Sequence, residues 1–88
     1  MPSPGVLGRY FVPNGKMELR PIYDARQLGE LIRSRRHELG LTQTEVAEVA
    51  DTNLRFVSEL ERGKPTARLE NVMRVLATLG IQLEARVR

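Results

Sequence analysis

The sequence contains no cysteine and only one histidine, His37. Without cysteine the chain has no disulfide, no thiol nucleophile and no cysteine ligand for zinc, and a single histidine excludes a histidine metal cluster. No apolar run approaches the roughly 18–20 residues that span a bilayer, and residues 1–7 lack the charged and apolar regions of a secretory signal. We therefore expect a cytoplasmic protein without a membrane segment, metal or other cofactor.

The basic residues are mostly of one kind. Of the 14 basic side chains among 88 residues, twelve are arginine, and the formal net charge is +3. The forked guanidinium matches phosphate oxygens and guanine edges better than an ammonium group does, so the excess favours a nucleic-acid partner. A codon bias towards high GC content would produce the same excess. A single domain this short buries roughly 60–65% of its unfolded surface, so oligomerisation would help to stabilise it.

Residues 1–22 are expected to form an extension separate from the rest of the chain. Asn14 and Gly15, between the semi-apolar runs 10–12 and 17–19, are a hairpin signal. A disordered arm fits the same composition, and Arg9, Lys16 and Arg20 would suit a minor-groove arm. A continuous helix is excluded by the prolines and glycines of this segment, which are Pro2, Pro4, Gly5, Gly8, Pro13 and Gly15.

Residues 23–80 are predicted to form one helical domain with helices over 25–39, 43–50, 54–61 and 68–79. Asp24 and Asn53 are N-cap residues, and Thr42 with Glu45 has the spacing of a capping box. A glycine follows the first, third and fourth helices, at Gly40, Gly63 and Gly80. The fourth helix has no strong cap at its start. The apolar faces predicted from helical spacing comprise Leu28, Ile32, Arg36 and Leu39; Val46, Ala47 and Ala50; Val57, Leu60 and Glu61; and Leu69, Val72, Met73, Leu76 and Leu79.

Two short helices joined by the polar residues 51–53 are typical of a helix-turn-helix, which places its second helix in the major groove. With Val57 facing inward, Leu54, Arg55 and Glu59 of the 54–61 helix face outward. Arginine suits guanine, glutamate accepts from cytosine N4, and leucine contacts a thymine methyl. An ordinary solvent-exposed helix face would carry similar residues.

Three segments of the chain closely resemble the Xre/Cro helix-turn-helix family. They are Gln-Thr-Glu-Val-Ala at 43–47, Phe-Val-Ser-Glu-Leu-Glu-Arg-Gly-Lys at 56–64 and Val-Leu-Ala-Thr-Leu-Gly at 75–80. The resemblance covers about residues 26–80 and implies a mainly-α, phage-repressor-like domain of four to five helices. The DNA-contacting residues that it implies are Gln43, Thr44, Asn53, Leu54, Arg55, Glu59, Arg62 and Lys64.

Two charged residues occupy apolar helix faces. Arg36 lies on the buried side predicted for the first helix and Glu61 on that of the third. Because an unpaired buried charge is very costly, we expect the two to pair, and in similar proteins such a pair joins these helices. The alternative is that Arg36 extends to solvent. The family usually carries glycine in the turn where this chain has Asp51, which tolerates a left-handed conformation better than most residues.

The residues after the fourth helix alternate with a period of two. Ile81, Leu83, Ala85 and Val87 are apolar and the residues between them are polar, so a half-buried strand is predicted over 81–88. A lone edge strand invites pairing with another chain. We favour pairing with the same segment of a second copy, which would present two recognition helices about 34 Å apart to a palindromic operator. The alternative partner is the N-terminal hairpin.

An Xre-type core followed directly by a strand resembles the HipB-type antitoxins. That resemblance implies a dimeric repressor that autoregulates its operon and restrains a HipA-like kinase toxin. A toxin-binding segment is then a further alternative for residues 1–20. The alternatives are a stand-alone regulator without a toxin, and a protein-interaction module that has lost DNA binding. No catalytic residue is predicted, because Glu45, Glu48 and His37 are expected on solvated helix faces without a glycine loop or metal spacing.

Overall fold

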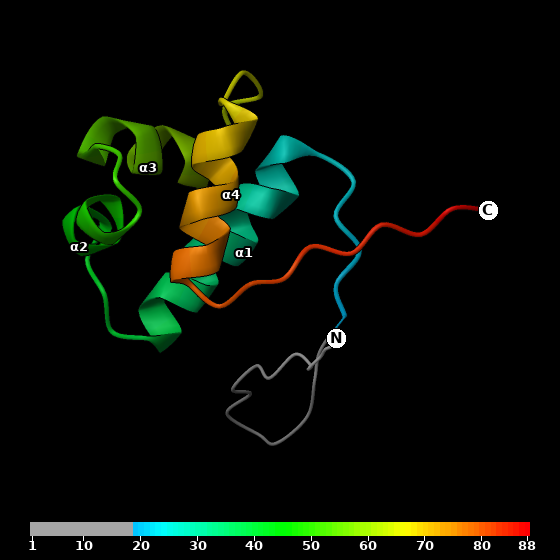
Figure 1. Cartoon of the computed structure of the whole chain (residues 1–88), viewed down its shortest axis with the longest axis horizontal. Coiled ribbons are helices and arrows are strands. Elements are labelled where there is room, and N and C mark those ends of the chain that lie inside the picture. Colours follow the sequence, from blue (N-terminus) through cyan, green and yellow to red (C-terminus); the bar gives the residue numbers. More distant parts are fainter. Residues whose placement is uncertain (1–18) are drawn as a thin grey trace.

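The computed structural model describes residues 19–88, which contain four helices (Figure 1). They are α1 (Ala25–Glu38), α2 (Gln43–Val49), α3 (Leu54–Glu61) and α4 (Leu69–Thr78). In Figure 1, α4 lies in front of α1, α2 and α3 lie together at one side, and the C-terminal segment extends from the end of α4. The predicted mainly-α fold is confirmed, and each helix begins and ends within one residue of its predicted bounds.

The helix starts are held by the expected side-chain caps. Asp24 accepts a hydrogen bond from the backbone N–H of Gln27 at 2.8 Å, and Asn53 accepts one from Phe56 at 2.8 Å. Both halves of the capping box are present, because Thr42 Oγ1 accepts from Glu45 N–H and Glu45 Oε1 accepts from Thr42 N–H. The N-cap residue of α4, Arg68, makes no side-chain cap hydrogen bond, in agreement with the absence of a strong cap in the sequence.

The turn between α2 and α3 requires a left-handed residue, and Asp51 takes that conformation with φ of +57°. The following residue closes the turn, since the Thr52 N–H donates to the Ala47 carbonyl at 2.9 Å. Aspartate adopts this region more readily than most side chains. The substitution of aspartate for the usual glycine is therefore compatible with the turn.

The core lies between all four helices. Its buried members are Ile32, Val46, Ala47, Ala50, Val57, Leu60, Val72, Val75, Leu76 and Leu79. Three residues predicted on the apolar faces are instead exposed, with exposed fractions of 39% for Leu39, 70% for Leu69 and 47% for Met73. Leu39 is the C-cap of α1 and lies beyond Arg36, the last buried residue of that helix. On α4 the core side is centred on Val72, Val75, Leu76 and Leu79, so Leu69 and Met73 lie on the adjacent, uncovered side.

One glycine allows α1 to approach α3 closely. A Cβ atom at Gly29 would lie 2.4 Å from the Leu60 carbonyl oxygen and 2.7 Å from that of Glu61. Both atoms belong to backbone, which cannot move away as a flexible side chain would. Only glycine fits at this crossing, and the short approach brings Arg36 within reach of Glu61.

The segment after α4 does not form the strand expected over 81–88: no strand occurs among residues 19–88. Its first residue stays with the helical domain, because Ile81 N–H donates to the Leu76 carbonyl at 2.9 Å and its side chain packs against the core. Beyond it the residues are exposed. A strand exists only when its backbone has a partner, and within residues 19–88 this segment has none. The hairpin expected around Asn14 and Gly15 lies outside the described residues.

Among the described residues, none of the helices has the length and apolar character needed to cross a membrane.

Candidate nucleic-acid interface

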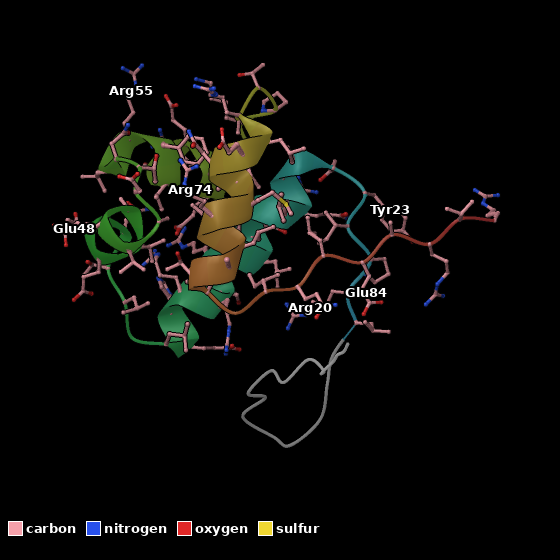
Figure 2. The ribbon with its side chains drawn as sticks, viewed as in Figure 1. Arg20, Tyr23, Glu48, Arg55, Arg74 and Glu84 are labelled. Carbon is pink, nitrogen blue, oxygen red and sulfur yellow. The ribbon has the colours of Figure 1, made fainter. Side chains whose placement is uncertain are left out.

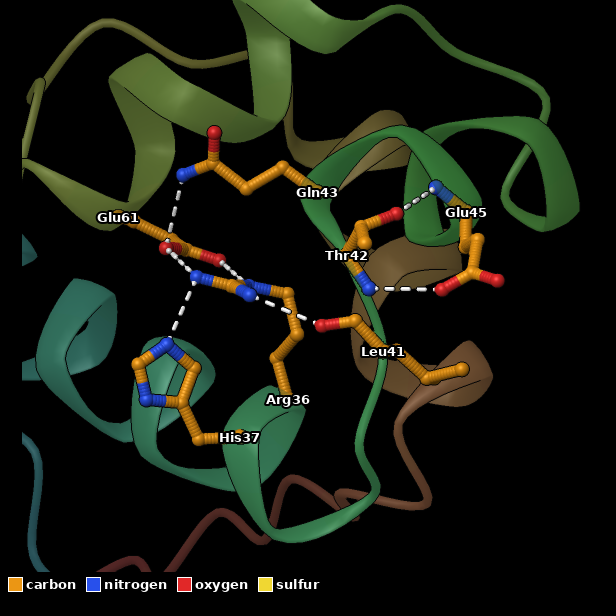
Figure 3. Close-up of polar contacts among 7 residues, drawn as sticks. All are labelled: Arg36, His37, Leu41, Thr42, Gln43, Glu45 and Glu61. Atoms are coloured by element: carbon orange, nitrogen blue, oxygen red, sulfur yellow. Dashed lines mark hydrogen bonds and ion pairs between the residues drawn. The ribbon is translucent and has the colours of Figure 1, made fainter.

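A buried ion pair joins α1 to the C-terminal end of α3 (Figure 3). Arg36 donates from Nε to Glu61 Oε2 at 2.6 Å and from Nη2 to Glu61 Oε1 at 3.0 Å. The side chains are 11% and 3% exposed, respectively. A bidentate arginine–carboxylate pair is geometrically specific as well as strong. The pair expected from the sequence is therefore present, and it sets the position of α3 relative to α1.

Further donors and acceptors complete this network. Arg36 Nη1 donates to the Leu41 carbonyl at 2.9 Å, and Gln43 Nε2 donates to Glu61 Oε1 at 3.0 Å (Figure 3). His37 Nε2 lies 3.2 Å from Arg36 Nη2. Every buried side-chain nitrogen and oxygen in the described part of the chain has a partner. The network ties α1, the loop before α2, the start of α2 and α3 together.

The network also changes the protonation equilibria of its two charged members. Burial alone would raise the pKa of Glu61, but hydrogen bonds from Arg36 and Gln43 outweigh it and hold the pKa below its usual value. The hydrogen bond to Glu61 raises the pKa of Arg36. Both shifts favour the charged forms, so the pair is ionised at neutral pH.

With its inner face held, α3 presents its other face to solvent. Val57, Leu60 and Glu61 are buried. Leu54 is 49% exposed, and the Arg55 side chain is 85% exposed and projects away from the domain (Figure 2). A helix held in this way offers an apolar contact and a guanidinium fork within one exposed turn, which suits reading of a base edge.

A second charged cluster lies on this outer face. Glu59 Oε2 accepts from Arg55 Nε at 3.2 Å, and Glu59 Oε1 accepts from Lys64 Nζ at 3.1 Å. Lys64 comes from the loop after α3, so the cluster joins the helix to that loop. The hydrogen bonds from Lys64 and Arg55 lower the pKa of Glu59. The structure therefore brings three of the residues expected at the interface into direct contact.

The remaining residues expected at the interface occupy different positions. Gln43 turns its amide towards Glu61, and the Asn53 side-chain oxygen is used in the cap of α3. Thr44, in the first turn of α2, and Arg62, the C-cap of α3, are exposed. Thr44 and Arg62 are therefore accessible to a ligand. Gln43 and Asn53, in contrast, already make hydrogen bonds within the protein.

Two arginines that were not predicted as functional residues donate hydrogen bonds to carbonyl groups at helix C-termini. Arg74 on α4 donates from Nε to the carbonyl of Ala50, the C-cap of α2, at 2.9 Å and also contacts Asn71 (Figure 2). Arg35 on α1 donates from Nε to the carbonyl of Leu79, the C-cap of α4, at 2.9 Å. A cation at a helix C-terminus is favoured by the helix dipole. In the sequence, the one feature that could have indicated these contacts is that each arginine borders an apolar helix face.

The residues considered for acid–base chemistry have other roles or none. Glu45 belongs to the capping box of α2, His37 lies beside Arg36, and Glu48 is exposed on α2. Within residues 19–88, no group of three or more histidine or acidic residues is placed to hold a metal ion.

This geometry agrees with the relatives of the chain. The family model described as "Helix-turn-helix" matches residues 32–85. A curated protein, the uncharacterized HTH-type transcriptional regulator y4mF of Sinorhizobium fredii, is 47% identical over 57 residues, which cover 65% of this chain and 75% of that protein. The chain belongs to this helix-turn-helix family, of the Xre type, whose members are DNA-binding transcriptional regulators.

Solved structures share the fold. A HipA-HipB-O2-O3 complex contains a chain that matches with a TM-score of 0.73 and 22% identity over 78% of this chain and 97% of its own length. A HipB-O4 20mer complex matches with a TM-score of 0.72 and 22% identity, with 78% and 97% of the two chains covered. The restriction-modification controller protein C.AhdI from Aeromonas hydrophila has a TM-score of 0.61 and 27% identity, with 67% and 86% covered. The resemblance to HipB is thus one of fold.

Proposed function

We propose that this protein is a sequence-specific transcriptional repressor that inserts α3 into the major groove. The observation that carries the proposal is the orientation of α3: Val57, Leu60 and Glu61 hold it inward, and Arg55 projects outward with 85% of its side chain exposed. Thr44, Arg62 and Lys64 flank this face and suit phosphate contacts, which fix the protein on the duplex without reading its sequence. Leu54, Arg55 and Glu59 are the candidates for base contacts.

The proposal is tested by selecting bound duplexes from a randomised library and then measuring affinity over a salt series. Specific binding predicts that one sequence is enriched and is bound at least 10³-fold more tightly than an unrelated duplex. Affinity should fall steeply as salt rises, because bound cations release counterions from the phosphates. An affinity without salt dependence would favour the alternative, a protein-interaction module that no longer binds DNA.

We further propose that the protein acts as a homodimer joined through residues 81–88. Leu83 and Val87 are 47% and 92% exposed in the single chain, and Leu83 borders an open apolar groove with Met73, Leu76 and Ile81. Pairing of this segment with its copy would satisfy its backbone groups and cover Ile81, Leu83, Ala85 and Val87 on one face. A two-fold dimer binds a palindromic operator with half-sites one helical turn apart.

Light scattering measures this directly, because the chain has a mass of 10.0 kDa and a dimer has about twice that mass. Leu83→Lys should give the monomer, since a charge would enter the apolar face of the paired strands. Gln82→Lys adds the same charge at the adjacent residue, whose side chain would lie on the opposite face of the strand. This variant should remain a dimer. Equal masses for both variants would place the dimer contact elsewhere.

We also propose that the protein is the antitoxin of a HipA-type kinase toxin and represses their shared operon. The support is the match of this fold to a chain of a HipA-HipB-O2-O3 complex and to a chain of a HipB-O4 20mer complex. Co-purification with the product of the adjacent gene tests it. A stable complex with a kinase-like protein is expected. The absence of such a gene would favour a stand-alone regulator, which binds the same DNA without a protein partner.

A further inference from the structure

Glu59 lies between the two cations that the proposed function assigns to DNA. One of its oxygens is 3.2 Å from Arg55 Nε and the other is 3.1 Å from Lys64 Nζ. The Glu59 side chain is 23% exposed, whereas those of Arg55 and Lys64 are 85% and 47% exposed. One carboxylate therefore bridges a helix residue and a loop residue at the surface that would face the phosphates.

We propose that Glu59 is a positioning residue that restrains Arg55 and Lys64 and thereby weakens binding to DNA of arbitrary sequence. This inference rests on the proposed DNA-binding function. It differs from the role expected from the sequence, in which Glu59 accepts a hydrogen bond from cytosine N4. Both of its carboxylate oxygens are already engaged by the two cations, so the carboxylate is held against Arg55 and Lys64 and would contact a base only through a further hydrogen bond.

The atoms used by Arg55 explain how one residue can oppose nonspecific binding and still permit base reading. Glu59 accepts from Nε, whereas the two Nη groups form the fork that contacts guanine O6 and N7. Arg55 can therefore read a base while it is paired with Glu59. Lys64, by contrast, is assigned only phosphate contacts, and the paired carboxylate offsets part of the charge with which it attracts phosphates.

Electrostatics points in the same direction. The exposed residues of α3 and of the segment that follows it include Arg55, Arg62 and Lys64, and Glu59 is paired with two of these three cations. Nonspecific binding depends on cations that replace counterions on the phosphates. A carboxylate within salt-bridge distance of two of those cations reduces their attraction for any duplex, whatever its sequence.

The test compares wild type with Glu59→Gln and, as a control, Glu48→Gln. Glu48 is exposed on α2 and points away from the domain on a different side from Arg55 (Figure 2), and no ion pair involving it is found within residues 19–88. Both variants remove one negative charge. Affinity for a mixed-sequence duplex of about 20 base pairs is measured by fluorescence anisotropy from about 50 to 200 mM salt, the range over which counterion release changes nonspecific affinity strongly.

Glu59→Gln is expected to bind this duplex about three- to tenfold more tightly at low salt, with the slope of log affinity against log salt steeper by roughly one. Glu48→Gln should change affinity less than about twofold, as expected for a charge that is not paired with the interface cations. Equal effects of the two variants would overturn the inference, because only net charge would then matter. Weaker binding by Glu59→Gln would overturn it as well, since Glu59 would then support the contact with DNA.

A second measurement shows whether Glu59 acts through its two partners. In a chain carrying Arg55→Gln and Lys64→Gln, adding Glu59→Gln should have no more effect than adding Glu48→Gln. A persistent large effect would contradict the inference. If the wild-type protein showed no salt-dependent affinity for any duplex, the proposed DNA-binding function itself would fail, which is a distinguishable result. Thermal melts of all variants check that the fold is retained.

Discussion

α3 takes part in two arginine–glutamate pairs of similar chemistry in opposite environments. Arg36 and Glu61 meet on the inner side, where both are nearly inaccessible to solvent. Arg55 and Glu59 meet on the outer side, where the arginine is 85% exposed. A buried charge has lost its hydration and is stabilised by its partner, so breaking the pair is costly. An exposed charge can replace its partner with water or ions at little cost. The same residue types therefore hold the fold on one side and remain available for a ligand on the other.

The largest expected effect is the loss of the inner pair. Glu61→Ala should lower the free energy of unfolding by about 3–5 kcal/mol, because Arg36 is left buried without its partner. Urea unfolding followed by circular dichroism measures this. Glu59→Ala is the matched control from the outer pair and should leave the unfolding midpoint close to that of wild type. A midpoint unchanged by Glu61→Ala would refute the structural role of the pair.

The close approach that makes the inner pair possible can be broken separately. Gly29→Ala should lower the free energy of unfolding by about 1–3 kcal/mol, because its Cβ overlaps the backbone of α3. Ser34→Ala, at an exposed position of the same helix, is the control and should have little effect. Equal stability of the two variants would show that α1 and α3 are not held at the described distance.

Substitutions on the outer side should affect recognition and not stability. Arg55→Ala should remove about 1–3 kcal/mol of discrimination at one position of each half-site. Lys64→Ala should weaken binding to all duplexes alike and reduce the salt slope by roughly one. Affinities for the selected operator and its single-base variants distinguish the two. Identical patterns for both variants would mean that the reading face is misplaced.

A smaller effect is expected from acid, which should reduce the contribution of the inner pair to the free energy of unfolding. The pKa of Glu61 is lowered on folding, so its contribution to stability is present above its unfolded pKa of about 4.5 and is lost as pH falls through the folded value. Urea unfolding between about pH 7 and 3 should show this loss, and it should persist at high salt because the pair is buried. The loss should be reduced in Glu61→Gln. An identical pH profile for Glu61→Gln would assign the loss to other carboxylates.

Local signals in the sequence were sufficient for the helices and for one part of the site. Caps such as Asp24, Thr42 and Asn53 act over three residues, so spacing alone reveals them. Arg36 and Glu61 are 25 residues apart, but each stands out as a charge on an apolar face, and that conflict with burial predicted their contact. The left-handed conformation of Asp51 had no such local signal, and only the glycine that the resembled family usually carries at this position pointed to it.

Contacts between elements were not predictable to the same degree. Nothing near Gly29 indicates that the backbone of α3 crosses there, and Arg74 gives no local sign that it holds the end of α2. Periodicity also placed Leu69 and Met73 in the core, although α4 turns both outward. The tail shows the same limit, because alternation predicts a strand but cannot supply its partner.

The sequence alone thus specified where the helices begin and end and which charges must be neutralised. Caps, turns and periodic faces depend on residues that are close together in the chain. Three-dimensional packing decided which side of α4 is covered, which carbonyls the arginines hold, and that Glu59 bridges Arg55 and Lys64. Those outcomes depend on the angles and distances at which helices cross, and these follow from the packing of all side chains together.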